Sequence, residues 1–184
     1  MPEFIVRGAP AAPVAAASPG PASSALVPGY PRFRWGRPPE EGLYLGYRET
    51  NCLPERRAAH GLCEADALRV RGIRRIGDRF LEEWGFGRLR PLVGTLISEL
   101  AANAVQHGHG HVKVVWAWTL KGLLLTTAHE NTVRVRPPAT DGRAEPDGFA
   151  ESGRGLLLVD AQVDRWGAHG GTVWCCLDLA GTGR

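Results

Sequence analysis

Residues 89–128 decide the fold, and they read LRPLVGTLISELAANAVQHGHGHVKVVWAWTLKGLLLTTA. Between Leu89 and Val105 the apolar residues recur every three or four positions, which is the spacing of one face of a helix. Pro91 suits the first turn of this helix, and Gly108 suits its end. The stretch therefore predicts an amphipathic helix of about five turns.

The second half of the same stretch predicts a β-hairpin. Apolar residues alternate at positions 112, 114, 116, 118 and 120, so one strand should place all five side chains on one side. Lys121 and Gly122 form the expected turn, and residues 123–128 return as a second strand.

Further elements are predicted on both sides of this stretch. One more helix is predicted for residues 67–84, ended by Gly85 and Gly87. Another helix is predicted for residues 155–164, and a strand for residues 172–179. Residues 44–47 are expected to form a short edge strand, and residues 56–62 a short helix. The polar stretch 130–152 is too long for a plain connection, so it is interpreted as a functional loop or a disordered one.

The N-terminal part has a different composition. Residues 1–40 hold nine of the 14 prolines and a run of small residues. Such a segment buries too little apolar area to offset the entropy of ordering it. We therefore expect a flexible Pro/Ala-rich tail over 1–40 and one domain over 41–184.

Charge, hydropathy and cysteine content exclude some classes. The net charge of +3 is too small to indicate nucleic-acid binding, and no apolar run approaches the roughly 20 residues of a membrane helix. The four cysteines have no zinc-ribbon spacing, and adjacent Cys175 and Cys176 on a strand would point to opposite faces. These features favour a reducing, cytoplasmic location.

Two patterns could carry chemistry. Glu99 and Asn103 are four residues apart, so they share one helix face and could orient a water and hold a hydrated Mg²⁺. Gly153, Arg154 and Gly155 precede an apolar helical run, where backbone N–H groups and a guanidinium could hold an anion. Each has a plain alternative: a polar pair at a helix rim, and an ordinary turn.

Two other clusters have weaker interpretations. His107, His109 and His111 are expected to be surface or capping residues rather than metal ligands, because no carboxylate or cysteine cluster completes a site. An arginine stripe, spaced at i and i+4, could be a solvated helix face, a docking surface for an acidic partner or, least favoured, a nucleic-acid contact; it consists of Arg71, Arg75 and Arg79.

Taken in order, three motifs resemble a known family over roughly residues 67–180. LISELAANAVQHG (96–108) resembles the N-box of the Bergerat-fold, histidine-kinase-like ATPases. ESGRGLLLVD (151–160) resembles the second glycine box, and DRWG (164–167) with GGTVW (170–174) resembles the closing strand. The likeness is to the anti-sigma factor serine/threonine kinases, in particular the small actinomycete regulatory proteins.

This resemblance implies a fold and roles for residues. The fold would be an α/β (α+β) two-layer sandwich, with helices on one face of a mixed, mostly antiparallel sheet. Glu99 would be the catalytic residue, acting as general base or polarising the attacking hydroxyl, and Asn103 would bind Mg²⁺. The glycine box at 153–155 would cradle the phosphates of ATP beneath a lid of residues 131–152. Thr172 would help to hold the adenine through water. The implied partners are a sigma factor and an anti-sigma antagonist protein whose serine or threonine is phosphorylated, and a homodimer is compatible with the family.

One departure from the family pattern favours an alternative function. The family places an aspartate after the second hairpin strand, where it accepts a hydrogen bond from the adenine amino group; here the best-aligned acid is Glu130, one methylene longer. The kinase prediction therefore stands beside a second hypothesis, a non-catalytic protein-binding module with a degenerate ATP site.

Overall fold

The computed structural model describes residues 5–7, 32–39, 44–55, 61–130 and 152–179. Seven strands form one sheet in the order β1-β3-β4-β5-β7-β6-β2. Neighbouring strands are antiparallel except for β6 and β2, which run parallel. The strands are β1 (Ile5–Arg7), β2 (Phe33–Trp35), β3 (Gly46–Cys52), β4 (Val112–Trp118), β5 (Gly122–His129), β6 (Arg165–His169) and β7 (Thr172–Asp178).

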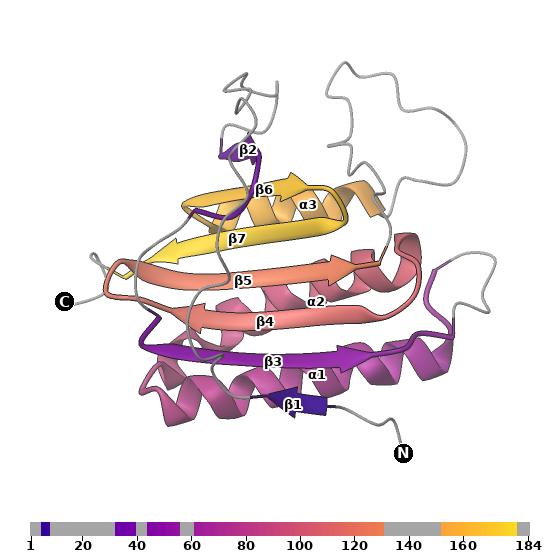
Figure 1. Cartoon of the computed structure of the whole chain (residues 1–184), viewed down its shortest axis with the longest axis horizontal. Coiled ribbons are helices and arrows are strands. Elements are labelled where there is room, and N and C mark those ends of the chain that lie inside the picture. The colour runs from indigo at the N-terminus through magenta and orange to yellow at the C-terminus, as the bar shows by residue number, and fades with distance from the viewer. Residues whose placement is uncertain (1–4, 8–31, 40–43, 56–60, 131–151, 180–184) are drawn as a thin grey trace.

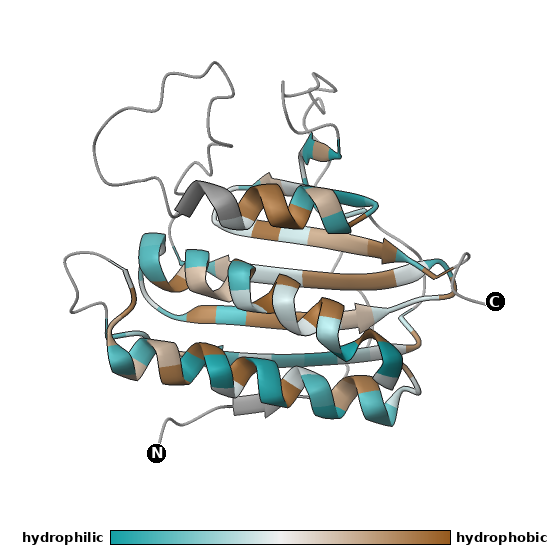
Figure 2. Cartoon of the chain, turned by 180° about the vertical axis from the view of Figure 1, so that it is seen from behind, coloured by the Kyte–Doolittle hydropathy of each residue, from teal (hydrophilic) through white to brown (hydrophobic). Residues whose placement is uncertain are grey.

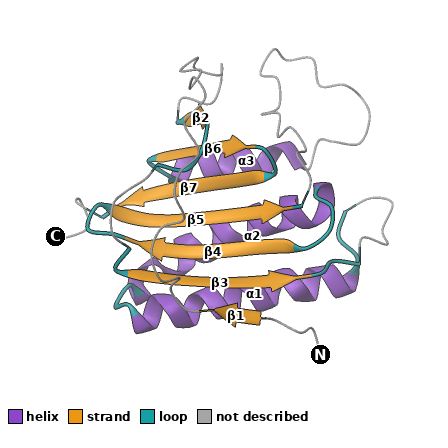
Figure 3. Cartoon of the chain, in the orientation of Figure 1, coloured by secondary structure: helices purple, strands orange, loops and turns teal. Residues whose placement is uncertain are grey.

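Three helices cover one face of this sheet (Figures 1 and 3). They are α1 (Glu64–Glu83), α2 (Arg90–His107) and α3 (Ser152–Gln162), and a 3-10 turn, η1 (Gly87–Leu89), joins α1 to α2. Seen from behind, the helices lie along the strands (Figure 2). The expected two-layer α+β sandwich with a mixed, mostly antiparallel sheet is confirmed.

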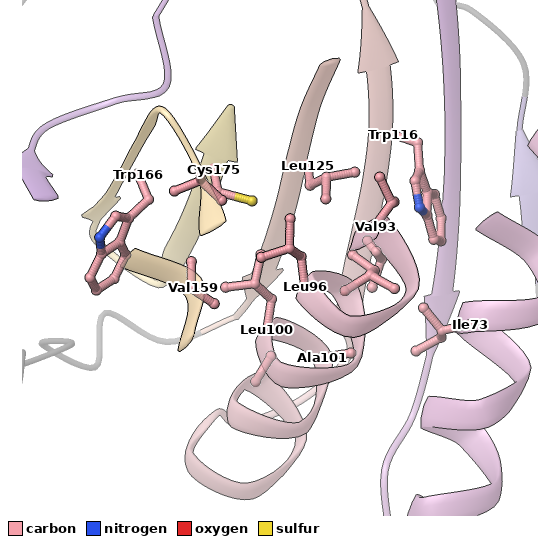
Figure 4. Packing of buried hydrophobic residues seen from close by; sticks show 14 of the residues in the cluster. Ile73, Val93, Leu96, Leu100, Ala101, Trp116, Leu125, Val159, Trp166 and Cys175 are labelled. Atoms are coloured by element: carbon pink, nitrogen blue, oxygen red, sulfur yellow. The ribbon is translucent and has the colours of Figure 1, made fainter. Parts of the chain in front are cut away.

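The main core lies between the helices and the sheet (Figure 4). Leu96 and Leu100 of α2 are at most 1% exposed and pack among residues of β4, β5, β7 and α3. Burial of these apolar side chains is the main source of stability for such a sandwich. It contributes about 25 cal/mol for each Å² of apolar surface removed from water.

A smaller cluster lies on the other face of the sheet, and it consists of Ala117, Leu124, Trp174 and Cys176. Trp174 donates an Nε1–H hydrogen bond to the Gly36 carbonyl oxygen at 2.9 Å, so the chain after β2 lies against this face. Cys175 belongs to the main core and Cys176 to the outer cluster, as expected for neighbours on a strand. Burial raises the pKa of the Cys175 thiol well above its ordinary value.

The predicted tail contains two strands of the sheet, so the prediction is wrong for those residues. β1 closes one edge by pairing with β3, and β2 closes the other by pairing with β6. Phe33 is fully buried in the main core. A composition dominated by proline and small residues hid a three-residue strand, because one buried aromatic side chain and a row of backbone hydrogen bonds are enough to anchor it. The rest of the tail, 1–4 and 8–31, lies outside the described residues.

Several other elements have bounds that differ from those predicted from the sequence. β3 spans 46–52 and is an interior strand rather than the predicted edge strand at 44–47. α1 starts three residues before the predicted position, and it stops where expected because Gly85 adopts a φ of +78° after the last turn. Leu120 does not share the buried side of β4, since it lies in the hairpin turn and is 85% exposed. Of the predicted helix at 56–62, residues 56–60 lie outside the described residues, and Gly61 and Leu62 are not helical.

No helix in the described part of the chain combines the length and the apolarity needed to cross a membrane.

Candidate functional site

The candidate site is built where α2 meets α3. Glu99 and Asn103 lie one turn apart on α2, and both are partly buried. Their neighbours Leu96 and Leu100 are anchored in the core, which fixes the face of α2 that carries the polar pair. The helix therefore presents a carboxylate and an amide at the rim of the core, as the sequence predicted.

Gly155 of α3 meets the Glu99 carboxylate. A Cβ atom added at Gly155 would overlap Glu99 Oε2, so the Glu99 carboxylate, where it now lies, occupies the space that a side chain at residue 155 would need. Among the described residues, the Glu99 carboxylate has no hydrogen-bond or ion-pair partner. The structure thus brings together Glu99 and Gly155, two residues 56 positions apart that the sequence assigned to separate motifs.

The first turn of α3 contains Gly153, Arg154 and Gly155. The first four N–H groups of a helix have no partner within the helix, and the dipole makes this end positive. The structure therefore places the three residues at a helix N-terminus, and binding of an anion there stays a prediction. The side chain of Arg154 lies outside the described atoms, so its predicted contact with phosphate stays a prediction.

Asn103 contributes a buried amide with an unsatisfied group. Its Nδ2 is buried without a hydrogen-bond partner in the described part of the chain. An unpaired buried donor costs about 1–3 kcal/mol, so such an atom calls for an explanation. A half turn of the amide exchanges Nδ2 with Oδ1, a ligand atom that Mg²⁺ prefers. The amide oxygen of Asn103, with the Glu99 carboxylate one turn away on the same helix, fits a hydrated magnesium ion.

The structure does not bring Glu130 to this pair. Its carboxylate lies against Gly110 and 2.9 Å from His111 Nδ1, with the side chain 60% exposed. The Glu130 backbone N–H also donates to the His109 carbonyl oxygen at 3.2 Å. Glu130 therefore contacts the segment that enters β4.

His129 is the residue that sequence reasoning missed. The helix-facing positions of β5 are Leu123, Leu125 and Thr127, and the alternation continues to His129. Its ring packs against Gly108 at the end of α2. The two-residue period from Leu123 indicates His129 for this side of β5, whereas the family pattern of an acidic residue indicates Glu130.

Thr172 also lies away from the pair. It opens β7, opposite Ala128 on β5 and His169 on β6. By alternation it shares the outer face of the sheet with Trp174 and Cys176, whereas Val173 faces the main core. A direct role for the Thr172 hydroxyl between the layers is not supported by this register.

The histidines and the arginine stripe lie on the surface. His107, His109 and His111 are exposed, and no group of three or more His, Cys, Asp or Glu in the described residues could hold a metal ion. His107 is exposed as a residue, but nearby protein atoms remove part of the water around its ring, and this desolvation lowers the pKa of the imidazole.

The arginine stripe is exposed along α1, and none of its guanidinium groups has an ion-pair partner among the described residues. Two nearby acids are already paired: Glu82 lies 2.7 Å from Arg90, and Glu83 lies 3.5 Å from Arg48.

In comparisons with known proteins, no family model matches the chain, and no curated protein sequence matches it.

Proposed function

We propose that this chain is an ATP-binding regulator of the anti-sigma factor type, with a protein serine/threonine kinase activity centred on Glu99. The observation that carries the proposal is the meeting of Glu99, from the N-box-like motif, with Gly155, from the glycine-box-like motif. The resemblance required these two motifs to share one site, and nothing in the spacing of the sequence places them together.

The chemistry of the pair supports a nucleotide together with a cation. A phosphate at the first turn of α3 would be favoured by the free N–H groups but repelled by the Glu99 carboxylate. A divalent cation relieves that repulsion, and Asn103 stands one turn away on the same helix face to bind it. When bound, Mg²⁺ would neutralise charge that develops on the transferred phosphoryl group.

The residues then have separate tasks. Phosphoryl transfer depends mainly on positioning and charge stabilisation. The backbone of residues 153–155 would hold phosphate oxygens, and Glu99 would accept the proton of the attacking serine or threonine hydroxyl at a carboxylate oxygen. The partners proposed are a sigma factor and an anti-sigma antagonist, and the exposed arginine stripe offers a basic surface for an acidic region of either.

Calorimetry with Mg²⁺-ATP tests the proposal. We expect the wild type to bind with an affinity that depends on Mg²⁺ and Asn103→Ala to lose that dependence, because the fold does not need the amide. Asn51→Ala, on β3, is the matched control and should bind as the wild type does. Mg²⁺-ATP affinity unchanged in a folded Asn103→Ala protein would remove Asn103 from the site.

A second function is favoured by one specific observation. Of the residues expected at the adenine, Glu130 pairs with His111, and the register of β7 puts Thr172 on the outer face of the sheet. Among the described residues, only groups proposed for the phosphate end lie together, and this supports a non-catalytic protein-binding module with a degenerate site. Absence of binding at millimolar Mg²⁺-ATP would favour this function over the kinase.

A further inference from the structure

Asp160, in the last part of α3, joins three segments that are far apart in the sequence. Its Oδ1 accepts hydrogen bonds from the Arg32 backbone N–H at 3.1 Å and from Trp166 Nε1 at 2.7 Å. Arg32 Nη1 in turn donates to the Asp160 carbonyl oxygen at 2.7 Å. One side chain thus links α3 to β2 and to β6, and it is only 6% exposed.

Aromatic packing reinforces this junction. The rings of Phe33 and Trp166 meet edge to face, with centroids 4.6 Å apart, and both side chains are fully buried. The Trp166 backbone N–H also donates to the Arg32 carbonyl oxygen at 3.0 Å. We call the set Arg32, Phe33, Asp160 and Trp166 the β2 latch.

The latch bears on the candidate site because α3 is short. A helix of 11 residues is marginal by itself in water, so tertiary contacts decide where it lies. Besides Asp160, its buried anchors are Leu156 and Val159. Gly155 precedes Asp160 by five residues, about 7.5 Å along the helix axis, so a shift at the latch moves Gly155 as well.

We infer that Asp160 is a positioning residue: by fastening α3 to β2 and β6, it sets the place of Gly155 against Glu99 and so controls the phosphate end of the site. This inference rests on the proposed function for its effect on nucleotide. On this inference, residues 32–35 have a structural role that their composition did not indicate. They hold α3 in place, and the first turn of α3 contains residues 153–155.

The test uses full-length chains with one substitution each. Asp160→Ala removes the acceptor shared by Arg32 and Trp166, whereas Asp160→Asn keeps an Oδ1 acceptor at the same place. Trp166→Phe removes one donor and keeps a buried ring, so it carries the test if Asp160→Ala does not fold. Val70→Ala, a buried truncation on α1, controls for a general loss of stability.

Two measurements are made on each variant. Hydrogen exchange of α3 amides without nucleotide should quicken in Asp160→Ala and Trp166→Phe but not in Asp160→Asn or in Val70→Ala. The Kd for Mg²⁺-ATP should rise at least about tenfold in the first two, because a displaced first turn of α3 no longer holds its backbone N–H groups where the phosphate lies. Asp160→Asn should keep a Kd close to that of the wild type. If Asp160 acted only through its negative charge, the Kd of this variant would rise as well.

Two results would overturn the inference. One is a folded Asp160→Ala protein with unchanged α3 exchange, and the other is quickened exchange with an unchanged Kd. If the wild type does not bind Mg²⁺-ATP at all, the proposed function fails, and α3 exchange alone then decides whether Asp160 positions the helix.

Discussion

Phe33→Ala should destabilise the whole domain, although Phe33 lies in a segment whose composition predicts a dispensable tail. Its side chain is fully buried in the main core, and a buried Phe→Ala change costs about 3–5 kcal/mol. Loss of the edge-to-face contact with Trp166, at 4.6 Å, contributes about 0.5–1.5 kcal/mol of such a total. For a chain of this length, 1 kcal/mol lowers Tm by about 2–4 °C, so the expected fall is about 6–20 °C.

Thermal denaturation followed by circular dichroism measures this change. Arg37→Ala is the control, because Arg37 is exposed in the same segment and should leave Tm within about 2 °C, as surface substitutions usually do. A truncation that starts near residue 41 should lower Tm at least as far as Phe33→Ala, since it also removes β1 and β2. If Phe33→Ala has the same Tm as the wild type, β2 is not part of the core and the β2 latch has no basis.

Three further predictions concern the candidate site and the surface. Gly155→Ala should abolish Mg²⁺-ATP binding in calorimetry at a small cost in Tm, because the new methyl displaces the flexible end of Glu99 rather than backbone; unchanged binding would show that Glu99 and Gly155 do not form one site. Glu130→Ala should leave nucleotide affinity and Tm nearly unchanged, since its exposed pair with His111 contributes about 0–1 kcal/mol, and a large loss of affinity would restore it to the adenine end. Charge reversal of the arginine stripe should weaken binding to an acidic protein partner in a pull-down without changing the Kd for ATP. DNA binding with a steep salt dependence, lost in the same variant, would instead support a nucleic-acid function.

Most of the secondary structure could be predicted because its periodicity is local. The three-and-four spacing from Leu89 to Val105 corresponds to α2, and the alternation after Val112 corresponds to β4. The face of α2 that carries Glu99 and Asn103 follows from the same spacing, since Leu96 and Leu100 beside them had to be buried. These features depend only on neighbours within a few residues, so the sequence contains them directly.

Strands of three residues left no such pattern. β2 is recognisable only through what it meets, because Phe33 packs on Trp166 and Arg32 bonds to Asp160, each more than 120 residues away. A stretch rich in proline and alanine can still form an edge strand when a strand far away in the sequence, here β6, pairs with it through backbone hydrogen bonds. Composition averages over a window and cannot detect a single buried phenylalanine.

The sequence by itself determined the helix with its polar pair, the hairpin and the order of the three motifs. The tertiary structure decided that Glu99 meets Gly155, that His129 rather than Glu130 continues the helix-facing side of β5, and that Thr172 shares the outer face. It also decided that α3 is fastened by a residue of the N-terminal segment. The physical reason is the same in each case: periodicity gives the direction of a side chain relative to its own element, whereas sheet order and helix packing determine which distant groups that side chain meets.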